Sequence, residues 1–271
     1  MGKISTKELN VGMKFMDAKQ IARYIDDGAN YYLRLFGDAE HMEYVDLGYY
    51  SYVKPKEGEQ GIQFVFDVRL EDLSPEMKKD KTAEIKALNM PIWLDILASN
   101  DVHKLMFGTE KEHGKIELED NDEAYMALLP QERSIPLPNG SDLRVIKVET
   151  KEQFQVWTTL ANDILSGGSP DMNAEYHYPL VQKRLMKCYI GYKNDVPAAV
   201  SAIMDKEGIT SLEFVATLPA MRRQGLSRAV CNMAIKDAFD DDSKIITLRA
   251  FGIEARRLYE SLGFQTYNYV L

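Results

Sequence analysis

The residues best suited to chemistry lie where an apolar run, Leu212–Leu218, meets Pro219 and then a segment rich in Arg, Gln and Gly. We expect a strand to end at Pro219 and a helix to begin with the sequence RRQGLS, residues Arg222–Ser227. The first amides of a helix have no partner within it, and together with the helix dipole they bind anions such as a pyrophosphate. Gly225 lets the backbone approach the phosphates, and the two arginines add positive charge.

A second segment, Ala255–Phe264 (ARRLYESLGF), places an apolar stripe and Tyr259 on one face of a short predicted helix. An arginine-rich helix start alone is a weak signal, because many helices that bind nothing begin in the same way. Taken together, however, the two segments resemble the GNAT superfamily of N-acetyltransferases. Val215–Ser227 is similar to its acetyl-CoA signature, Arg/Gln-x-x-Gly-x-Gly/Ala after a strand and a proline. Ala255–Phe264 matches its second hallmark, Ala-x-x-Leu-Tyr-x-x-x-Gly-Phe, in the expected order with one strand between.

The resemblance implies roles for these residues. The backbone of Val215–Thr217 would pair with the pantetheine arm, and an amide there would stabilise the oxyanion that forms on the acetyl group. The amides of Arg223–Ser227 would hold the pyrophosphate. The predicted site for acetyl-CoA, the co-substrate, therefore comprises Val215, Ala216, Thr217, Arg222, Arg223, Gln224, Gly225, Leu226 and Ser227. Two positions depart from the family pattern: Ser227 replaces Gly or Ala, and Gly252 replaces an Asn that often helps to hold the cofactor.

Two side chains are candidates for proton transfer. Tyr259 stands where the family commonly has the general acid that protonates the departing thiolate. The alternative is a packing role, because Ala255, Leu258 and Leu262 share its helical stripe. Glu213 is the candidate base, and strand alternation predicts that it shares a face with Val215 and Thr217. Its alternatives are a solvated strand residue or an ion pair, and a water chain could replace it as the base.

Other residues with reactive side chains have weaker roles in this prediction. Tyr176, His177 and Tyr178 follow a Gly-Gly-Ser-Pro break and are either acceptor contacts or aromatic anchors at a helix start. Cys188 and Cys231 are expected to be buried, and direct transfer needs no covalent cysteine intermediate. The histidines show no metal-ligand spacing with each other or with the cysteines, so no metal site is expected.

These residues must be positioned by an α+β domain. Periodicity in the second half predicts strands and helices in the order β-α-α-β-β-β-α-β-α-β, which implies a mixed, mostly antiparallel sheet flanked by helices and fits the GNAT fold. The helices are expected at 151–163, 174–186, 222–239 and 254–262. The strands are expected at 143–150, 188–193, 198–204, 212–218, 244–251 and 264–270.

The first half carries no such phosphate-binding turn. We expect a helix over 18–36, a hairpin of 49–54 and 63–70, a helix opened by Ser74 and Pro75, and a strand at 124–129. This order resembles a degenerate copy of the second half, and the tyrosines, Tyr32 among them, are expected to serve core and interface. The predicted organisation is an accessory GNAT-like domain over 1–130, a linker over 131–142 rich in proline and Asn-Gly, and the acetyltransferase domain over 143–271.

The uneven distribution of charge supports this division into two domains, and the net charge limits the classes of partner. The chain of 271 residues has a net charge of −9. Residues 1–142 hold 17 Lys and Arg against 27 Asp and Glu, whereas residues 143–271 hold 16 against 15. An acidic chain is a poor ligand for nucleic acid, and the near-neutral half suits an anionic cofactor better. No apolar run is long enough to span a membrane, and two cysteines cannot form a disulfide framework, so we expect a cytoplasmic protein.

The predicted function is transfer of acetyl from acetyl-CoA to a primary amine, directly in a ternary complex. The acceptor could be a small molecule or a peptide amine, and a homodimer is left open. The alternative from another class is a CoA-binding regulatory or scaffold protein without turnover, which the departures at Ser227 and Gly252 keep open. Retention of Tyr259 and Gly225 favours the enzyme. Transfer of a longer acyl group differs only in pocket depth.

Overall fold

The computed structural model describes residues 16–110, 118–130, 142–167 and 171–267. The elements of the first half of the chain are α1 (Ala18–Gly37), β1 (Met42–Asp46), β2 (Ser51–Pro55), β3 (Phe64–Phe66), α2 (Pro75–Ala87), α3 (Asn100–Phe107) and β4 (Glu123–Leu128). Those of the second half are β5 (Leu143–Lys147), α4 (Lys151–Leu165), α5 (Ala174–Gln182), β6 (Lys187–Lys193), β7 (Val196–Lys206), β8 (Ile209–Thr217), the 3-10 turn Pro219–Met221, α6 (Leu226–Asp240), β9 (Ile245–Phe251), α7 (Ile253–Glu260) and β10 (Gln265–Thr266).

The strands form two sheets. One is an antiparallel sheet in the order β1-β2-β3, and the other has seven strands in the order β10-β4-β9-β8-β7-β6-β5. Within the larger sheet only β8 and β9 run parallel. The expected mixed, mostly antiparallel sheet and its α+β class are therefore confirmed, as is the order of elements in the second half.

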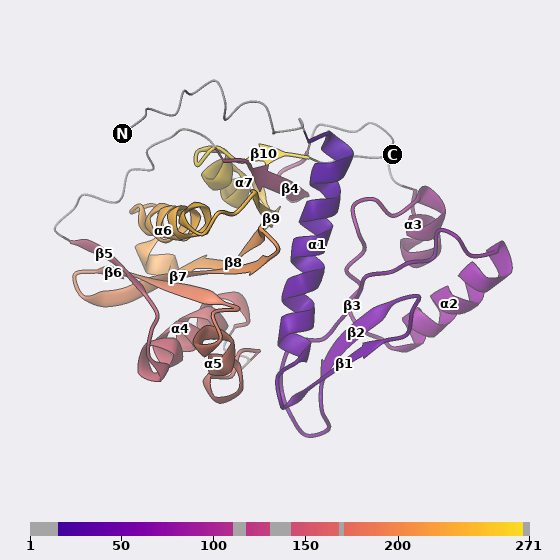
Figure 1. The fold of residues 1–271 in the computed structure, drawn as a ribbon, viewed down its shortest axis with the longest axis horizontal. Helices are drawn as coiled ribbons and strands as arrows, with labels where there is room; N and C mark the ends of the chain where they lie inside the picture. Colours follow the sequence, from indigo (N-terminus) through magenta and orange to yellow (C-terminus); the bar gives the residue numbers. More distant parts are fainter. Residues whose placement is uncertain (1–15, 111–117, 131–141, 168–170, 268–271) are drawn as a thin grey trace, which may run out of the picture.

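Helices cover both faces of the larger sheet. On one face, buried residues of α6 and α7 pack with β4 and β9 around Val230, Leu248 and Tyr259. On the other face, Trp157 of α4 and Phe36 of α1 belong to one core with β6 and β7. Figure 1 shows α1 running between the larger sheet and the β1–β3 sheet, so this first helix joins the two parts of the molecule.

Gly28 lets α1 lie close to the larger sheet. A Cβ at this position would lie 2.7 Å from the Thr247 hydroxyl oxygen and 3.3 Å from the Ser211 Cβ. Ser211 and Thr247 are the last paired residues of β8 and β9. The glycine therefore brings α1 against the sheet at the point where these two strands separate, and the aromatic residues that follow it in α1 lie beside that point.

β4 corrects the predicted division of strands. It precedes the expected linker, yet it lies between β9 and β10 in the larger sheet, with pairs from Glu123↔Phe251 to Leu128↔Ile246. The expectation that the strands before residue 131 would form a sheet of their own is therefore wrong for β4. Met126 and Leu128 are buried on the α6 side and Ala127 on the α1 side. A strand buried on both faces is typical of the interior of a sheet. Kinship between the two halves stays a prediction, and most of the expected linker lies outside the described residues.

Other elements agree with the predictions or differ for local reasons. Ser74 accepts a hydrogen bond from the Met77 amide and caps α2, as expected. α6 begins at Leu226 and not at Arg222, because Arg223 and Gly225 adopt positive φ angles of 62° and 84° that no helix can include. β1 and α3 were not predicted from the sequence, although α3 has two helix-boundary signals, a Ser99 cap at its start and a left-handed Gly108 at its end. Of the predicted last strand, residues 268–270 lie outside the described residues.

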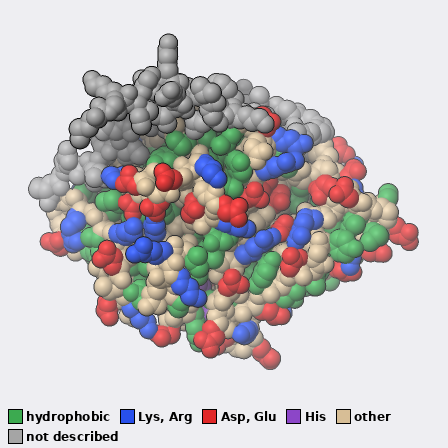
Figure 2. Space-filling model, viewed as in Figure 1, with side chains coloured by type: hydrophobic (Ala, Val, Ile, Leu, Met, Phe, Trp, Pro, Cys, Tyr) green, Lys and Arg blue, Asp and Glu red, His purple; other side chains and the backbone are tan. Residues whose placement is uncertain are grey.

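The surface is mixed in charge. On the face shown in Figure 2, acidic and basic side chains are interspersed over both halves of the molecule and do not gather into one large basic patch. Among the described residues, no helix combines the length and apolar character required to cross a membrane.

Candidate active site

The site begins where β8 and β9 part. The two strands pair only from Ile209↔Ile245 to Ser211↔Thr247. Beyond these residues β8 pairs with β7 alone and β9 with β4 alone. A cavity of about 420 Å³ lies at this gap, lined by β8, β9, α7, the α4–α5 segment and residues of the first half. The separation of the two strands therefore opens a cleft in the larger sheet.

A β-bulge shapes the β8 side of the gap. Ala202 pairs with Glu213 and Val200 with Ala216, so three steps on β8 oppose two on β7, and Phe214 has a φ of 54°. The extra residue changes the alternation of faces. Ala216 and Phe214 pack with α4 and α1, whereas Val215 packs on the α6 side. The expectation that Glu213 shares a face with Val215 and Thr217 is therefore wrong: its register places it on the same face as Ala216.

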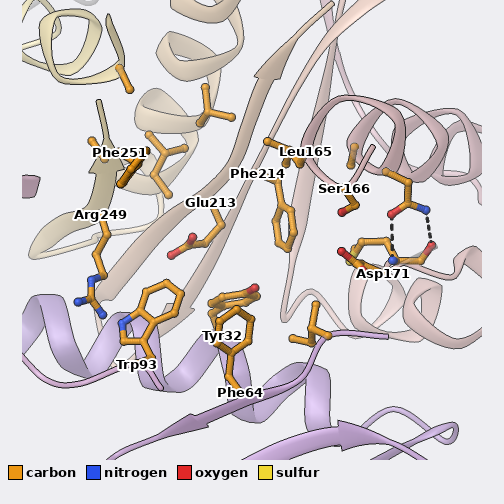
Figure 3. Close-up of a pocket in the computed structure, with 18 of the residues that line it drawn as sticks. Tyr32, Phe64, Trp93, Leu165, Ser166, Asp171, Glu213, Phe214, Arg249 and Phe251 are labelled. Carbon is orange, nitrogen blue, oxygen red and sulfur yellow. Dashed lines mark hydrogen bonds between the residues drawn. The ribbon is translucent and has the colours of Figure 1, made fainter. Parts of the chain in front are cut away.

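Glu213 lines the cavity, and Figure 3 shows its carboxylate directed into the open space. Burial raises the pKa of Glu213 to about 8, although the nearby positive charge of Arg249 opposes the shift. Burial also raises the pKa of Tyr32, and the charges of Glu213 and Asp171 raise it further. The charges of both carboxylates therefore act on the same tyrosine. A carboxyl group whose pKa lies near neutrality can accept a proton from an ammonium ion.

Tyr259 lies on the α7 side of the same cavity. Its side chain is buried among the α6–α7 core residues, and its ring meets Phe264 edge-on at a centroid distance of 5.7 Å. Burial raises the pKa of Tyr259, and the charges of Cys231 and Glu213 raise it further. The phenol therefore keeps its proton at neutral pH and can serve as a donor. Packing and chemistry, the two alternatives for this residue, are compatible in the structure.

The turn between β8 and α6 leaves the start of α6 open. Gly225 precedes the helix in a left-handed conformation, and no side chain caps the first amides. Among the described residues, a Cβ on Gly225 would meet only Leu143, at 3.9 Å. The Ser227 hydroxyl lies 2.7 Å from the Thr217 hydroxyl and ties the helix start to the end of β8. Free amides at the start of a fifteen-residue helix fit a pyrophosphate.

The first half of the chain supplies the other wall of the cavity. Tyr32 from α1, Phe64 from β3 and Trp93 lie together below Glu213 in Figure 3. The Trp93 ring stacks on the Arg249 guanidinium at 4.3 Å, and Tyr125 lies against the same group at 4.7 Å. The ion pair of Arg249 with Glu123 (3.2 Å) joins β9 to β4 beside this wall.

The α4–α5 segment closes the remaining side. Asn162 holds it in place, because its side-chain amide donates to the Met172 carbonyl (2.8 Å) and its oxygen accepts from the Met172 amide (3.0 Å). Figure 3 shows both bonds beside Ser166 and Asp171. These two polar side chains, with Leu165, line the cavity opposite Arg249.

Comparison with known proteins agrees with this architecture. The family model described as "Acetyltransferase (GNAT) family" matches residues 154–264, which include β8, the α6 start and Tyr259. Residues 154–264 form a GNAT domain. Since the family consists of acetyltransferases, the chain carries an acyltransferase domain. No curated protein matches the chain.

The chain is also similar to solved structures, of which the first shares its fold. A GCN5-related N-acetyltransferase from Kribbella flavida is 17% identical, with 89% of this chain and 91% of that chain covered and a TM-score of 0.60. A predicted acetyltransferase from Clostridium acetobutylicum, solved with acetyl-CoA, is 16% identical over 45% of this chain and 90% of its own, with a TM-score of 0.38. The similarity to the Kribbella flavida structure covers both halves of this chain.

The predicted cofactor residues of the GNAT domain lie along one path from the cavity to the α6 start. Val215 lines the cavity, and Ala216 and Thr217 follow it on β8. The arginines are already engaged: Arg222 Nε donates to the Thr217 carbonyl (3.3 Å), and the exposed Arg223 pairs with Glu254 (2.8 Å). Gln224 donates to the Ala220 carbonyl (3.4 Å), and Leu226 is buried at the helix start.

The structure explains why a glycine, and not the Asn of the family pattern, stands at position 252. Gly252 precedes α7 with φ 84° and ψ 155°, a conformation almost restricted to glycine. Its amide donates to the Asp122 carbonyl (3.4 Å), and the Ile253 amide donates to the Asp120 carbonyl (2.7 Å). An Asn here would be strained. The glycine therefore allows the segment before β4 to close the start of α7.

The aromatic cluster of α5 does not reach the cavity. The Tyr176 ring stacks on His41 at 4.4 Å, and His177 lies 5.0 Å from the same ring. The Tyr178 hydroxyl donates to the Glu149 carbonyl (2.9 Å). Of the two alternatives, the structure therefore supports aromatic anchors. Cys188 and Cys231 are buried and unpaired, as predicted.

Four residues that line the cavity were not predicted from the sequence: Phe64, Trp93, Asp171 and Arg249. The signal for Asp171 was present, because it directly follows the Gly-Gly-Ser-Pro break. Tyr32 was assigned to the core, and it is both buried and part of the cavity wall. Among the described residues, no group of three or more His, Cys, Asp or Glu side chains could hold a metal ion.

Proposed function

We propose that this protein transfers an acetyl group from acetyl-CoA to a primary amine by direct attack in a ternary complex. The observation that carries the proposal is the cavity at the β8–β9 gap, because both Glu213 of β8 and Tyr259 of α7 line it and β8 leads from it to the open start of α6. The GNAT match over this region supports acetyl transfer.

The α6 start is the proposed pyrophosphate site. Its first amides lack a side-chain cap, and Gly225 leaves open space for an approaching phosphate. The remaining polar atoms of the turn suit the same ligand: Thr217 and Ser227 place their hydroxyls 2.7 Å apart at its edge. Arg222 and Arg223 contribute positive charge close by, although Arg223 also faces Glu254.

The gap along β8 is the proposed channel for the acyl arm. From Leu212 onward, β8 has no strand partner on the β9 side, so backbone groups of Val215–Thr217 are available to an extended ligand. Such pairing resembles the addition of a strand to a sheet edge. One of these amides would donate to the acetyl oxygen as negative charge develops there, which lowers the barrier.

Glu213 and Tyr259 are the proposed proton acceptor and donor. Since the pKa of Glu213 is raised to about 8, its ionised fraction grows through the slightly alkaline range, where it can accept the proton of an arriving ammonium. Tyr259, whose pKa is raised above its ordinary value, holds the proton that the departing thiolate needs. We assign the first half an accessory role, as the wall that closes the acceptor side. Since both cysteines are buried and unpaired, we place the protein in the cytoplasm.

The test is a calorimetric titration of the full chain with acetyl-CoA, followed by detection of free CoA thiol in the presence of a panel of amines. Saturable binding and amine-dependent release of CoA are the expected results. Binding without release for any amine would favour a regulatory CoA-binding protein. No binding at all would rule out the proposed site.

A further inference from the structure

The cavity has two ends of different chemistry. In Figure 3, Phe251 lies above Glu213, on the side of β9 and α7, where the proposed function puts the thioester. Tyr32, Phe64 and Trp93 lie below Glu213, on the side of the first half. An acceptor amine that attacks beside β8 must therefore have its body against the lower, aromatic end.

The aromatic end is an ordered cluster. The Trp93 ring meets Phe64 at 5.7 Å and Tyr32 at 6.4 Å, both edge to face. Tyr32 in turn meets Phe214 of the β8 bulge at 5.6 Å and 88°. Such rings present faces and edges that favour another ring or a branched aliphatic group, and their faces attract an ammonium ion.

The charge of the wall favours a cation without a carboxylate. Glu213 and Asp171 both line the cavity, as does Tyr32. The positive group of the lining, Arg249, is already engaged with Glu123 and with the Leu94 carbonyl (3.4 Å). Its Nε and Nη1 atoms are buried, and its guanidinium lies 4.3 Å from the centre of the Trp93 ring and 4.7 Å from that of the Tyr125 ring, so the charge of Arg249 is already shared with protein groups.

We propose that the acceptor is a compact aralkylamine: a primary amine on a short alkyl chain that carries an aromatic ring and no carboxylate. The inference rests on the proposed function. The cavity of about 420 Å³ is at the small end of ligand pockets and must also admit the acetyl group, which favours a compact acceptor over a large polyhydroxylated amine. The ring of the acceptor lies against Trp93 and Tyr32, and its ammonium faces Glu213.

The transfer balances without a further reactant. The ammonium loses one proton to Glu213, and the nitrogen lone pair forms the N–C bond with the acetyl carbon. The C–S bond breaks with its electron pair on sulfur, which takes a proton from Tyr259. The nitrogen then loses its second proton, which restores the Tyr259 phenol, and Glu213 releases its proton to solvent. The products are therefore the N-acetylamine, CoA thiol and one proton.

Matched pairs of substrates test the proposal on the full chain. Phenethylamine and tryptamine differ from phenylalanine and tryptophan only by the α-carboxylate. We expect kcat/KM for each amine to exceed that of its carboxylated counterpart on the order of a hundredfold, because like charges at close range are strongly disfavoured. Asp171→Asn should reduce the ratio of kcat/KM for each amine to kcat/KM for its carboxylated counterpart. Equal rates, or preference for the amino acids, would overturn the proposal and make Arg249 an anion-binding residue.

Variants of the aromatic end test the placement of the ring. Phe64→Leu and Trp93→Leu should raise KM for phenethylamine about tenfold, the range expected when an aromatic contact is removed, with the Kd for acetyl-CoA unchanged. Phe64→Leu is informative even if the Trp93 variant is unstable, because Arg249 stacks on Trp93 and not on Phe64. Phe107→Leu is the control, since this phenylalanine is 48% exposed on α3 and lies outside the cavity lining. An unchanged KM in Phe64→Leu would contradict the placement.

The two proposals fail in distinguishable ways. Absence of acetyl-CoA binding defeats the proposed function and this inference together. Binding with acetylation of polyamines, aminoglycosides or a lysine peptide, but not of phenethylamine or tryptamine, overturns the aralkylamine proposal alone.

Discussion

Two strand–glycine–helix units flank the gap in the larger sheet. In the first unit β8 leads through Gly225 into α6, and in the second β9 leads through Gly252 into α7. Both glycines have a φ of 84°, and neither helix has a side-chain cap. On these two features alone the helix starts are alike, and either could be taken for an anion site.

Their surroundings differ. The start of α7 is closed by the carbonyls of Asp120 and Asp122, which accept from its first amides. The start of α6 faces open space, and its glycine has a ψ of −1° against 155° for Gly252. A helix dipole is therefore available to a ligand only where the rest of the chain does not use it. One unit is free to hold a cofactor, while the other fixes Tyr259 in place.

The largest expected difference between the units is in cofactor binding. Gly225→Glu should weaken acetyl-CoA binding more than a thousandfold, because the carboxylate would occupy the proposed phosphate path and repel it. Isothermal calorimetry on the full chain measures the effect. Gly48→Glu is the matched control: its φ is 81°, and a Cβ there meets no atom within 4 Å. Wild-type affinity in Gly225→Glu would move the site elsewhere.

The second unit should show its role in turnover. Tyr259→Phe keeps the ring that packs on Phe264 and removes the proton donor, so kcat should fall by about a hundredfold, the lower range for a general acid. The Kd for acetyl-CoA should stay the same. Tyr178→Phe, which removes a hydroxyl bonded to the Glu149 carbonyl outside the cavity, is the control. An unchanged kcat at saturation would exclude Tyr259 from the mechanism.

Glu213, on the first unit, should determine the pH profile. With a pKa raised to about 8, the carboxylate becomes the main form only as pH rises through 8, so kcat/KM should increase across that range. Glu213→Gln should lower the rate on the order of tenfold or more and remove that inflection. A profile with the same inflection in the variant would indicate that a water chain or another group is the base.

The raised pKa of Glu213 also predicts that the free energy of unfolding falls as pH rises. The folded pKa of Glu213 exceeds its ordinary value of 4.5, so the folded state binds the proton more tightly, and its contribution to stability is lost as pH rises from about 4.5 through 8. Burial and the charge of the neighbouring Asp95 also raise the pKa of Asp26, which contributes in the same direction. The comparison must therefore be between wild type and Glu213→Gln in parallel thermal melts. The variant should gain relative stability as pH rises from 5 to 8, and a constant difference would contradict the shift.

The smallest expected effect concerns Gly252. Gly252→Ala forces a side chain into φ 84° and ψ 155°, which should cost about 1–3 kcal/mol of unfolding free energy. Because the α6 start is a separate unit, acetyl-CoA affinity should change little. Urea unfolding and calorimetry measure the two quantities. A large loss of affinity at unchanged stability would show that the α7 start also contributes to the cofactor site.

Local sequence patterns determined much of the second half. Periodicity and the Pro and Gly residues that end strands and helices predicted the order of elements there and the turn before α6. The family motifs predicted the positions of Gly225 and Tyr259. Each of these depends on residues that are neighbours in the chain, where the dihedral preference of a single residue is decisive. The start of α6 shows the limit of this approach, since Arg223 and Gly225 delay the helix by one turn.

Tertiary structure decided what faces the gap. Trp93 and Phe64 carry no motif, and they become a wall only because α1 crosses the larger sheet at Gly28. The insertion of β4 beside β9 depends on pairs between residues more than a hundred positions apart, which no local window can contain. The sequence alone thus determined the proposed cofactor side, whose parts are contiguous, whereas packing of distant segments determined the acceptor side.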